Sequence, residues 1–428
     1  MKDINQRPII LVSNSSWYLF HYRKLLIQKI KKEKHHLIAL APYDSTSKDL
    51  SNFLVHIPWR MSRKKNQNLY SFFISFLRML LLIRAIKPKL IHSHTLQANL
   101  ISSIVSSFFG INCVLSFAGI GRFSKSKGLS KLFFIYIFKI IYFFSNYQRG
   151  TRFKYFFNPN RSIFIFQNQN DIDFLGKELN NLKTFNFSLI PGSGIPYSYI
   201  SKSNIFSKNS RWKKSPHNYL NRKALLCKVT FIYCARLLKS KGILLFLKLA
   251  KLNPNSKFLI FGSIDSSSKD SLTKNDILIF TRKCKNVSFM DNKLNPLLYK
   301  KINYPVLIVP SIYGEGFPRG IIEANTLSIP VISSKEAAEK IPIKNICYVN
   351  KKNNISGYEK CINKLTNEYF SGKLYLKLEN AKEKAIMNFS EKKIVEKTIE
   401  IYEYLNKKRN ESYLLNKDRD KLDNWIAQ

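Results

Sequence analysis

Residues Pro305–Leu327 read PVLIVPSIYGEGFPRGIIEANTL and hold a strand, a loop and a helix in succession. The apolar run PVLIVPS predicts a buried strand. The glycines of SIYGEGF predict a loop, and Pro318 suits the first turn of a helix over RGIIEANTL. A helix N-terminus preceded by glycines presents backbone N–H groups and a partial positive charge. We therefore expect this stretch to receive an anion such as a diphosphate.

Two glutamates, Glu315 and Glu323, lie within this stretch. Glu315 follows the predicted strand, where a carboxylate can accept hydrogen bonds from sugar hydroxyls. Glu323 lies between one and two turns into the predicted helix and suits a ribose diol. The alternative is that Glu315 is an ordinary loop acid and Glu323 a residue placed by the helix dipole.

A second group of charged residues occurs in FIYCARLLKSKGI. Arg236 and Lys241 follow a predicted strand and precede a predicted helix. Both cations can address a diphosphate, the arginine as a fork and the lysine as a point charge. Taken alone, two basic residues at such a turn are more often surface charges.

Apolar runs that end in polar or glycine residues alternate with helix-length segments along the whole chain. This pattern predicts an α/β protein with doubly wound parallel sheets. At 428 residues the chain exceeds one ordinary core, so we expect two domains. The predicted boundaries are 1–195 for the first domain, 196–385 for the second with 196–226 as a linker and surface loop, and 386–428 for a final helix and charged tail.

The charge is strongly unbalanced, with a formal net charge of +44 and no Asp or Glu between Leu50 and Asn170. A first half of this kind favours a large anionic partner, either a membrane surface or a nucleic acid. Biased base composition and a solvated face are the alternative explanation. The six cysteines form no CxxC pair, which is typical of reduced thiols in the cytosol.

The N-terminus resembles no signal peptide, and no stretch approaches the roughly 20 apolar residues of a spanning helix. Two shorter segments, Leu132–Phe144 and Ser71–Lys89, are rich in aromatic and aliphatic residues and flanked by cations. They have the composition of interfacial helices, and equally of core helices of the first domain. The expected location is cytoplasmic, on the inner face of the cytoplasmic membrane.

The stretch EGFPRGIIEA resembles the E-x7-E signature of glycosyltransferase family 4, and CARLLKSKG resembles the Arg and Lys positions of that family. The resemblance runs from about residue 8 to about residue 406. In the first half, HSHTLQANLISSI, FAGIGRF and FQNQNDIDFL resemble a subgroup that acts on polyprenyl-diphosphate-linked sugars. The resemblance to family 4 implies the GT-B fold, in which two Rossmann-like domains face each other and a C-terminal helix crosses back to the first domain.

By position, the resemblance assigns the donor sugar to Glu315 and to the backbone of Gly316 and Phe317. It assigns the ribose to Glu323 and the diphosphate to Arg236 and Lys241. It also implies a donor-facing role for three residues of the first domain, namely Asn14, Gly119 and Gly121. Many family members carry a histidine where this chain has Ala118, which leaves the transferred sugar open.

Three further motifs have competing interpretations. His94 follows a predicted strand and either faces the cleft or is structural. Asp171-Ile172-Asp173 spells the D-x-D metal signature of another glycosyltransferase fold, but no further carboxylates complete a site, so we expect no metal. The GSG of residues 192–194 lacks the rest of a dinucleotide fingerprint.

The resemblance implies a retaining transferase that needs no cofactor. It is expected to move a sugar of the N-acetylhexosamine class from a UDP-sugar to a polyprenyl-diphosphate-linked saccharide. The expected partners are the nucleotide-sugar, the lipid-linked acceptor and an anionic membrane, with no specific nucleic acid. Two alternatives stay open: a UDP-sugar epimerase of the same fold, and a non-enzymatic basic protein that binds nucleic acid or membrane.

Overall fold

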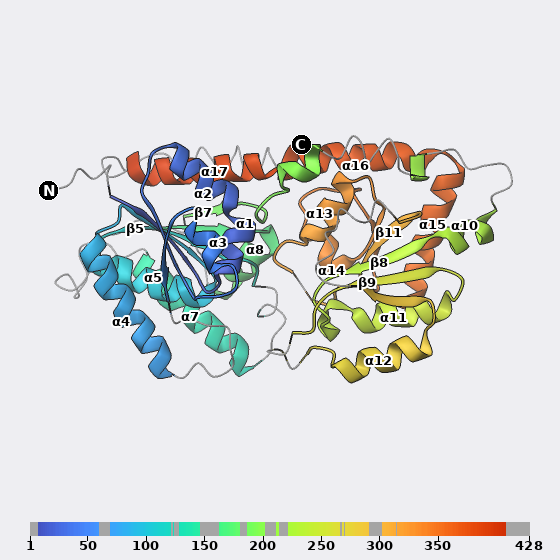
Figure 1. The fold of residues 1–428 in the computed structure, drawn as a ribbon, viewed down its shortest axis with the longest axis horizontal. Helices are drawn as coiled ribbons and strands as arrows, with labels where there is room; N and C mark the ends of the chain where they lie inside the picture. The colour runs from blue at the N-terminus through green and yellow to red at the C-terminus, as the bar shows by residue number, and fades with distance from the viewer. Residues whose placement is uncertain are drawn as a thin grey trace. The chain divides into compact units, whose positions relative to one another are not determined.

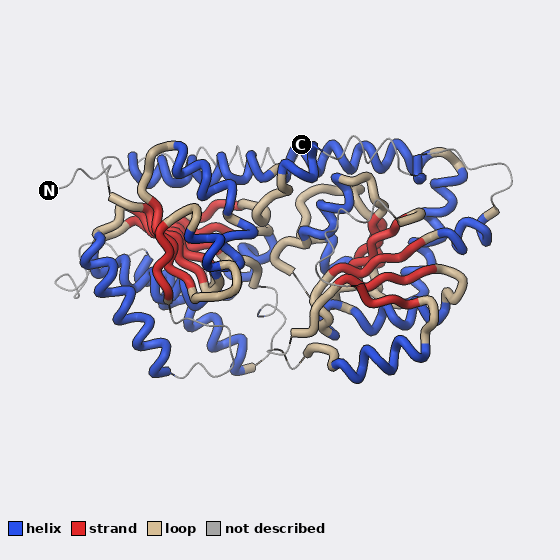
Figure 2. The backbone as a smooth tube through the Cα atoms, in the orientation of Figure 1, coloured by secondary structure: helices blue, strands red, loops and turns tan. Residues whose placement is uncertain are grey.

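The structure is a computed structural model. It describes residues 7–59, 69–120, 123, 128–145, 162–179, 186–201, 211–213, 221–265, 268, 270–290, 302–313 and 315–407. The chain forms two compact units, one of residues 1–193 with 392–428 and the other of residues 194–391. In each unit a single parallel sheet lies between layers of helices (Figures 1 and 2). The predicted α/β class with doubly wound parallel sheets is therefore confirmed.

Unit 1 is built on a seven-stranded sheet with the order β3-β2-β1-β4-β5-β6-β7. Every pair of neighbouring strands is parallel, for example β1 beside β4 with Ser13 opposite His94. Its strands are β1 (Ile9–Ser13), β2 (Leu37–Ala41), β3 (Val55–Pro58), β4 (Leu90–His94), β5 (Asn112–Ser116), β6 (Ser162–Phe166) and β7 (Phe187–Leu189).

Two hydrophobic cores cover the two faces of this sheet. One contains residues of α4 (Leu69–Ile86), α5 (Leu96–Phe109), α7 (Leu129–Ser145) and α8 (Gln169–Glu178). The other contains residues of α1 (Ser16–Tyr22), α2 (Lys24–Lys32) and the last helix, α17 (Glu391–Lys407). The short α3 (Ser47–Ser51) contacts α1 and β3. The helix at the end of the chain therefore packs in the first unit, as expected.

The first helix begins inside the polar stretch Asn14–Trp17. Ser15 is the N-cap of α1, and its hydroxyl accepts a hydrogen bond from the Tyr18 N–H. The helix therefore begins at Ser16, because serine is a strong cap that starts a helix inside a polar stretch. A break at Arg23 then separates α1 from α2.

Unit 2 has a six-stranded sheet with the order β10-β9-β8-β11-β12-β13. Its strands are β8 (Thr230–Cys234), β9 (Lys257–Phe261), β10 (Val287–Met290), β11 (Pro305–Val309), β12 (Val331–Ser334) and β13 (Tyr348–Asn350). Its helices are α10 (Arg222–Lys228), α11 (Ile243–Leu252), α12 (Lys274–Lys283), α13 (Arg319–Thr326), α14 (Lys335–Ala338), α15 (Ile355–Phe370) and α16 (Lys373–Phe389), with 3₁₀ turns η2 (Arg211–Lys213) and η3 (Lys239–Lys241).

The predicted linker 196–226 is partly core, which corrects the expectation of a surface loop. Trp212 is fully buried in the core that contains α11 and α15, and its indole N–H donates to the Pro305 carbonyl over 2.9 Å. Helix α10 adds Leu225 to the same core. An indole with apolar neighbours and a carbonyl acceptor is stable inside a protein. Trp212 therefore attaches part of this basic stretch to the core.

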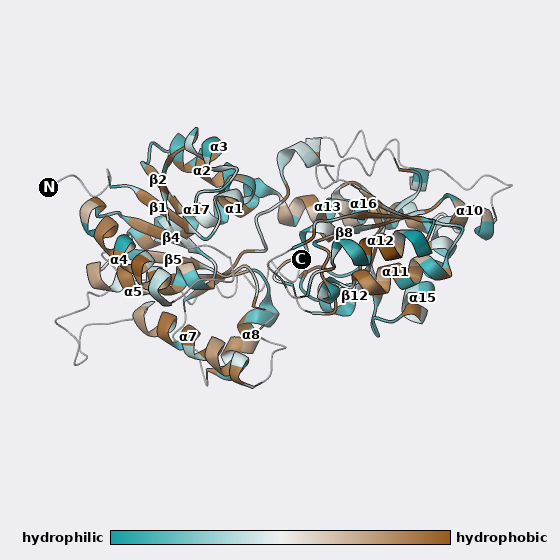
Figure 3. Cartoon of the chain, turned by 60° about the horizontal axis from the view of Figure 1, so that its bottom comes forward, coloured by the Kyte–Doolittle hydropathy of each residue, from teal (hydrophilic) through white to brown (hydrophobic). Residues whose placement is uncertain are grey.

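Helices α4 and α7 consist mostly of hydrophobic residues (Figure 3), and each has a buried face and an exposed apolar face. In α7, Phe134 and Phe138 are buried, whereas Phe133 is 65% and Tyr136 is 64% exposed. Each helix thus packs in the core with one side, and the aromatic residues on the other side stay uncovered. No helix in the described part of the chain is long and apolar enough to cross a membrane.

Candidate active site

The candidate site of unit 2 lies where the strand order reverses. The chain runs outward from β8 to β9 and β10 on one side, and from β11 to β12 and β13 on the other. In open parallel sheets, the carboxyl ends of the strands at such a point form the usual ligand crevice. Arg236 and Lys241 follow β8, and Glu315 follows β11. The fold therefore brings both predicted groups of residues to one edge.

Lys241 and Glu315 form an ion pair with 2.7 Å between Nζ and Oε1. Their side chains are only 14% and 16% exposed, so water screens the pair weakly. The Lys241 ammonium also lies 5.2 Å from the centre of the Tyr313 ring. Both residues line a cavity of about 50 Å³, together with residues of β8, β11 and α13.

Gly242 determines how closely these two segments approach. It has a φ of +78°, and a Cβ atom at this position would lie 1.9 Å from the Pro310 carbonyl oxygen. The Ile312 N–H also donates to the Ser240 carbonyl over 3.0 Å. Only glycine allows the turn after β8 to contact the loop after β11. Gly242 was not among the predicted site residues. A glycine directly after Lys241, at the start of a helix, is the sequence signal that could have identified it.

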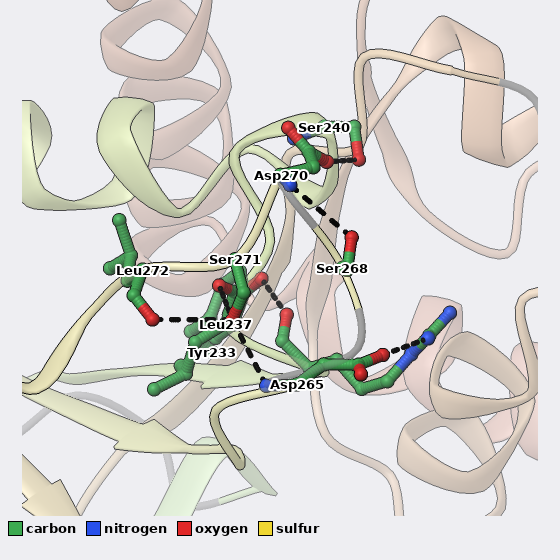
Figure 4. Close-up of polar contacts among 9 residues, drawn as sticks. Tyr233, Leu237, Ser240, Asp265, Ser268, Asp270, Ser271 and Leu272 are labelled. Atoms are coloured by element: carbon green, nitrogen blue, oxygen red, sulfur yellow. Dashed lines mark hydrogen bonds and ion pairs between the residues drawn. The ribbon is translucent and has the colours of Figure 1, made fainter. Parts of the chain in front are cut away.

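Arg236 is held by a carboxylate that the sequence analysis missed. Its Nη1 lies 2.7 Å from Asp265 Oδ2, and the Arg236 side chain is half exposed. Asp265 follows β9, the strand beside β8, and its backbone N–H donates to the Ser271 hydroxyl over 3.0 Å (Figure 4). The polar stretch GSID directly after the apolar strand KFLIF is the signal that was available.

The same loop carries a second carboxylate that the sequence analysis missed, Asp270. It accepts hydrogen bonds from the backbone N–H and the hydroxyl of Ser240 (Figure 4). The Asp270 carbonyl also accepts from the Lys239 N–H over 2.9 Å. These contacts fix the 3₁₀ turn η3 in which Lys241 lies.

Tyr233 supports the backbone next to Arg236. Its hydroxyl donates to the Arg236 carbonyl over 3.0 Å. Burial raises the pKa of this phenol well above its ordinary value, and the nearby Glu315 carboxylate raises it further. The phenol therefore keeps its proton and remains a donor at all physiological pH values.

Glu323 points to a partner on its own helix. Arg319 Nε lies 2.7 Å from Glu323 Oε1, four residues along α13. Burial raises the pKa of the Glu323 carboxyl, although the Arg319 charge acts in the opposite direction. Pro318 is the N-cap of α13, one residue before the predicted position.

Some of the predicted site residues of unit 2 line the same cavity, and others do not. Glu315 and Lys241 line the small cavity, and Arg236 and Glu323 do not. Gly316 and Phe317 follow Glu315 directly, and the Phe317 ring packs 5.2 Å from the Phe389 ring. This contact attaches the loop to the end of α16.

The three predicted residues of the first half all belong to unit 1. Asn14 follows β1, and its Oδ1 is buried without a hydrogen-bond partner among the described residues. Gly119 follows β5 and has a φ of +102°, while Gly121 lies outside the described residues. Ala118 is exposed.

The D-x-D motif separates into two different environments. Asp171 is buried, and its Oδ2 accepts the Ile120 N–H over 2.9 Å, so it holds the loop after β5. Asp173 is exposed and accepts a hydrogen bond from Gln169. Among the described residues, no three His, Cys, Asp or Glu side chains are grouped so that they could hold a metal ion.

His94 is fully buried at the end of β4, and neither ring nitrogen has a hydrogen-bond partner among the described residues. Its ring lies 4.1 Å from that of His92, which bonds Tyr402 of α17 through Nδ1 and Ser116 through Nε2. Burial lowers the pKa of both imidazoles. The structural interpretation of His94 fits this environment better than a cleft-facing one.

Residues 222–385, nearly all of unit 2, match the family described as Glycosyl transferases group 1. Over 295 residues the chain is 26% identical to the capsular polysaccharide biosynthesis glycosyltransferase CapM of Staphylococcus aureus, covering 68% of this chain and 70% of that protein. This relative is distant, and its name describes its own role.

Solved structures resemble the chain over almost its whole length. Sucrose-phosphate synthase from Thermosynechococcus elongatus has a TM-score of 0.68 at 15% identity and covers 94% of this chain and 99% of its own. A glycosyltransferase from Rickettsia africae has a TM-score of 0.66 at 17% identity, covering 94% and 100%. HepE from Anabaena, solved with UDP, has a TM-score of 0.65 at 15% identity, covering 93% and 100%. The chain therefore has the GT-B fold, and its residues 222–385 are similar to the Glycosyl transferases group 1 family.

Proposed function

We propose that this protein is a retaining glycosyltransferase that moves a sugar, of the N-acetylhexosamine class, from a UDP-sugar to a polyprenyl-diphosphate-linked saccharide. The product would be a capsular or other cell-surface polysaccharide, and the enzyme would work at the cytoplasmic face of the membrane. The single observation that carries the proposal is the Lys241–Glu315 pair at the switch point of unit 2. The name of the CapM relative supports the capsule, and the UDP bound to HepE supports the nucleotide.

Both partners of the Lys241–Glu315 ion pair can still form hydrogen bonds to the sugar donor. Lysine has three N–H donors and a carboxylate has two oxygens, so one mutual contact of 2.7 Å leaves others for ligands. In the proposed complex the second Glu315 oxygen accepts hydroxyl hydrogens of the donor sugar. Lys241 then donates to the diphosphate while its charge stays fixed by Glu315. The two groups are already in place before the donor arrives, which reduces the cost of reorganisation.

Arg236 can also form further hydrogen bonds to the sugar donor. Asp265 contacts one terminal nitrogen, Nη1, and the half-exposed guanidinium has four further N–H groups. We assign these to the diphosphate. As the bond between the anomeric carbon and the diphosphate breaks, negative charge grows on the leaving oxygens. Two cations held by carboxylates stabilise that charge without moving.

The proposed reaction keeps the anomeric configuration. The acceptor hydroxyl attacks from the face on which the diphosphate departs, a new bond forms between its oxygen and the anomeric carbon, and its proton passes to a departing phosphate oxygen. No protein general base is required by this scheme, and no cofactor or metal takes part. Glu323, paired with Arg319, is assigned to the ribose.

The membrane part of the proposal rests on the uncovered apolar faces of α4 and α7. Both helices belong to unit 1, whose sequence between Leu50 and Asn170 contains no acidic residue. Exposed aromatic residues next to cations are typical of helices that lie in a membrane interface. A polyprenyl-linked acceptor would be reached there.

The decisive experiment measures nucleotide release across a panel of UDP- and GDP-sugars, with and without an undecaprenyl-diphosphate-linked acceptor, in EDTA. We expect release only with one UDP-sugar and the lipid together. Donor turnover without acceptor would favour an epimerase or a hydrolase instead. Loss of all activity in EDTA, restored by a divalent ion, would contradict the metal-independent scheme.

Two variants test the assigned residues in the same assay. Glu315→Gln and Arg236→Ala should each lower turnover at least roughly tenfold, which corresponds to about 1.4 kcal/mol of transition-state stabilisation. The exposed Glu359→Gln in the same unit is the matched control and should keep wild-type turnover. Wild-type rates in both test variants would remove these residues from the proposed mechanism.

A further inference from the structure

Unit 1 contains a cavity of about 220 Å³ at the amino ends of its central strands. Arg7 precedes β1, Lys87 and Lys89 lie between α4 and β4, and Arg84 lies in the last turn of α4. All four cations line the cavity. It therefore lies at the opposite edge of the sheet from Asn14 and Gly119, which follow strand carboxyl ends.

The cations around this cavity have few negative neighbours in the described part of the chain. Among the described residues that line the cavity, none is a carboxylate. Glu33 acts on Lys89, but its carboxylate bonds Lys29 at 3.1 Å, and the Lys89 ammonium contacts the uncharged ring of His35 instead. The described lining thus holds four cations and no carboxylate.

Helix dipoles account for only part of this charge. Helices α4 and α5 both end at the cavity, and their carboxyl termini contribute roughly half a negative charge each. One of the four cations is offset in this way, and roughly three positive charges remain. An anion that enters the cavity would relieve the mutual repulsion of these cations, since like charges gathered at one site destabilise a fold.

A stripe of exposed apolar side chains on α4 leads to this cavity. Tyr70, Phe73, Leu77 and Leu81 are 73%, 56%, 38% and 64% exposed, and Arg84 continues the series. The positions are three or four residues apart, so all five lie on one face of the helix. An exposed apolar helix face that ends at a cationic cavity suits a ligand in which an apolar part adjoins an anionic group.

We propose that the cavity binds the phosphate of an anionic phospholipid headgroup, while the Tyr70–Leu81 stripe enters the membrane interface. Arg84 and Lys87 are exposed at the mouth and would meet the phosphate first, and Arg7 and Lys89 lie further in. A free phosphate would explain the cations and leave the adjoining apolar stripe unexplained. The inference rests on the membrane association proposed above and adds a specific headgroup site to it.

The test is co-sedimentation of the full chain with phosphatidylcholine vesicles, with and without phosphatidylglycerol. The test variant is Arg84→Gln/Lys87→Gln, at two exposed positions whose replacement spares the core. The control is Lys248→Gln/Lys251→Gln on α11, which removes the same charge from exposed positions of unit 2. We expect the test variant to lose affinity for phosphatidylglycerol vesicles by at least roughly tenfold, and the control to lose little. Equal melting temperatures confirm that both variants fold.

Each other outcome overturns the inference. Equal losses in both variants would show that only net charge matters, and an unchanged test variant would show that the cavity takes no headgroup. If inorganic phosphate raises the melting temperature of the wild type but not of the test variant, and vesicle binding shows no preference for phosphatidylglycerol, the ligand is a free anion.

A second measurement tests the proposed function separately from the headgroup site. Transfer to the lipid-linked acceptor in detergent needs no vesicle, and the test variant should match the wild type there. Failure of transfer would contradict the proposed reaction and leave the vesicle result standing. A wild type that binds no vesicle would overturn the membrane association and the headgroup site together.

Discussion

At the scale of single residues, the candidate active site depends on close packing as much as on charge. Lys241 meets Glu315 because Gly242 lets the turn after β8 touch the Pro310 carbonyl. Asp270 bonds Ser240 in the same turn and so fixes its path. The charged pair is thus positioned by Gly242, which carries no charge, and by a carboxylate from the loop after β9.

Gly242→Ala tests this positioning. Its Cβ would lie 1.9 Å from the Pro310 oxygen, and the φ of +78° adds strain. Gly372→Ala is the matched control, because its φ is +74° but no atom lies within 4 Å of the added Cβ. We expect the control to cost about 1–2 kcal/mol of unfolding free energy, and Gly242→Ala about 1–3 kcal/mol more.

Calorimetric unfolding of the two variants measures this difference, and nucleotide release measures its effect on the site. Turnover should fall in Gly242→Ala and stay near the wild-type value in Gly372→Ala. Equal stability losses in the two variants would show that the contact with Pro310 does not set the geometry of the turn.

At the scale of elements, α17 joins the end of the chain to the sheet of unit 1. Tyr402 bonds His92 of β4, and the Leu405 carbonyl accepts from the Asn112 side chain of β5. Ile394 and Val395 enter the same core as β1 and α2. One amine of this helix, that of Lys397, is partly buried.

Lys397 predicts a pH dependence of stability. Burial, together with the Lys393 charge, lowers the pKa of Lys397 to about 8, whereas the unfolded value is that of a free lysine, about 10.4. Between these values the unfolded chain binds one more proton than the folded chain, so stability rises with pH. The contribution is fully unfavourable below pH 8 and is relieved progressively as the pH rises from about 8 to about 10.4.

Lys397→Gln should therefore be more stable than the wild type near pH 7, and this advantage should vanish towards pH 10. The measurement is the difference in melting temperature between wild type and variant at each pH. Lys392→Gln, on the same helix with a side chain that is 84% exposed, should show no such trend. A constant difference for Lys397→Gln across this range would contradict the prediction.

At the scale of the whole molecule, the chain passes between the two units at two neighbouring points. Gly194 has a φ of +81°, and a Cβ there would lie 2.4 Å from Glu391 Cα. The Ile195 N–H donates to the Phe389 carbonyl over 2.7 Å, and the Glu391 N–H donates to the Ile195 carbonyl over 2.9 Å. The GSG of residues 192–194 is thus an exit that needs glycine rather than part of a dinucleotide fingerprint.

Truncation tests whether unit 1 needs the end of the chain. Ending the chain after Glu391 removes Ile394, Tyr402 and Leu405 from the core of unit 1. Deletion of residues 408–428 is the control, because it leaves α17 complete. We expect the shorter chain to lose the unfolding transition of unit 1 and to bind a hydrophobic dye, since an uncovered apolar sheet face is not stable in water.

Calorimetry and dye fluorescence distinguish the two truncated chains. The control should unfold as the wild type does. A chain ending at Glu391 that keeps both transitions would show that α17 covers unit 1 without stabilising it.

The sequence by itself determined the strands, the two-sheet α/β fold and the residues that carry charge around the predicted diphosphate site. It could do so because apolar periodicity, glycine and proline placement and strand-to-helix turns are local properties. The burial of Trp212 could not be predicted from the sequence, because it depends on residues far away in the chain. The start of α1 could not be predicted either, because a polar stretch with a serine suits a turn as well as a helix cap.

Only the tertiary structure decided which charges meet. It paired Arg236 with Asp265 and Lys241 with Glu315, and it gathered Arg7, Arg84, Lys87 and Lys89 around one cavity. Parallel strands bring residues from separate parts of the chain to one edge, and the strand order that selects those residues follows from packing of the whole unit. A charge seen in the sequence therefore acquires its partner only when the sheet is assembled.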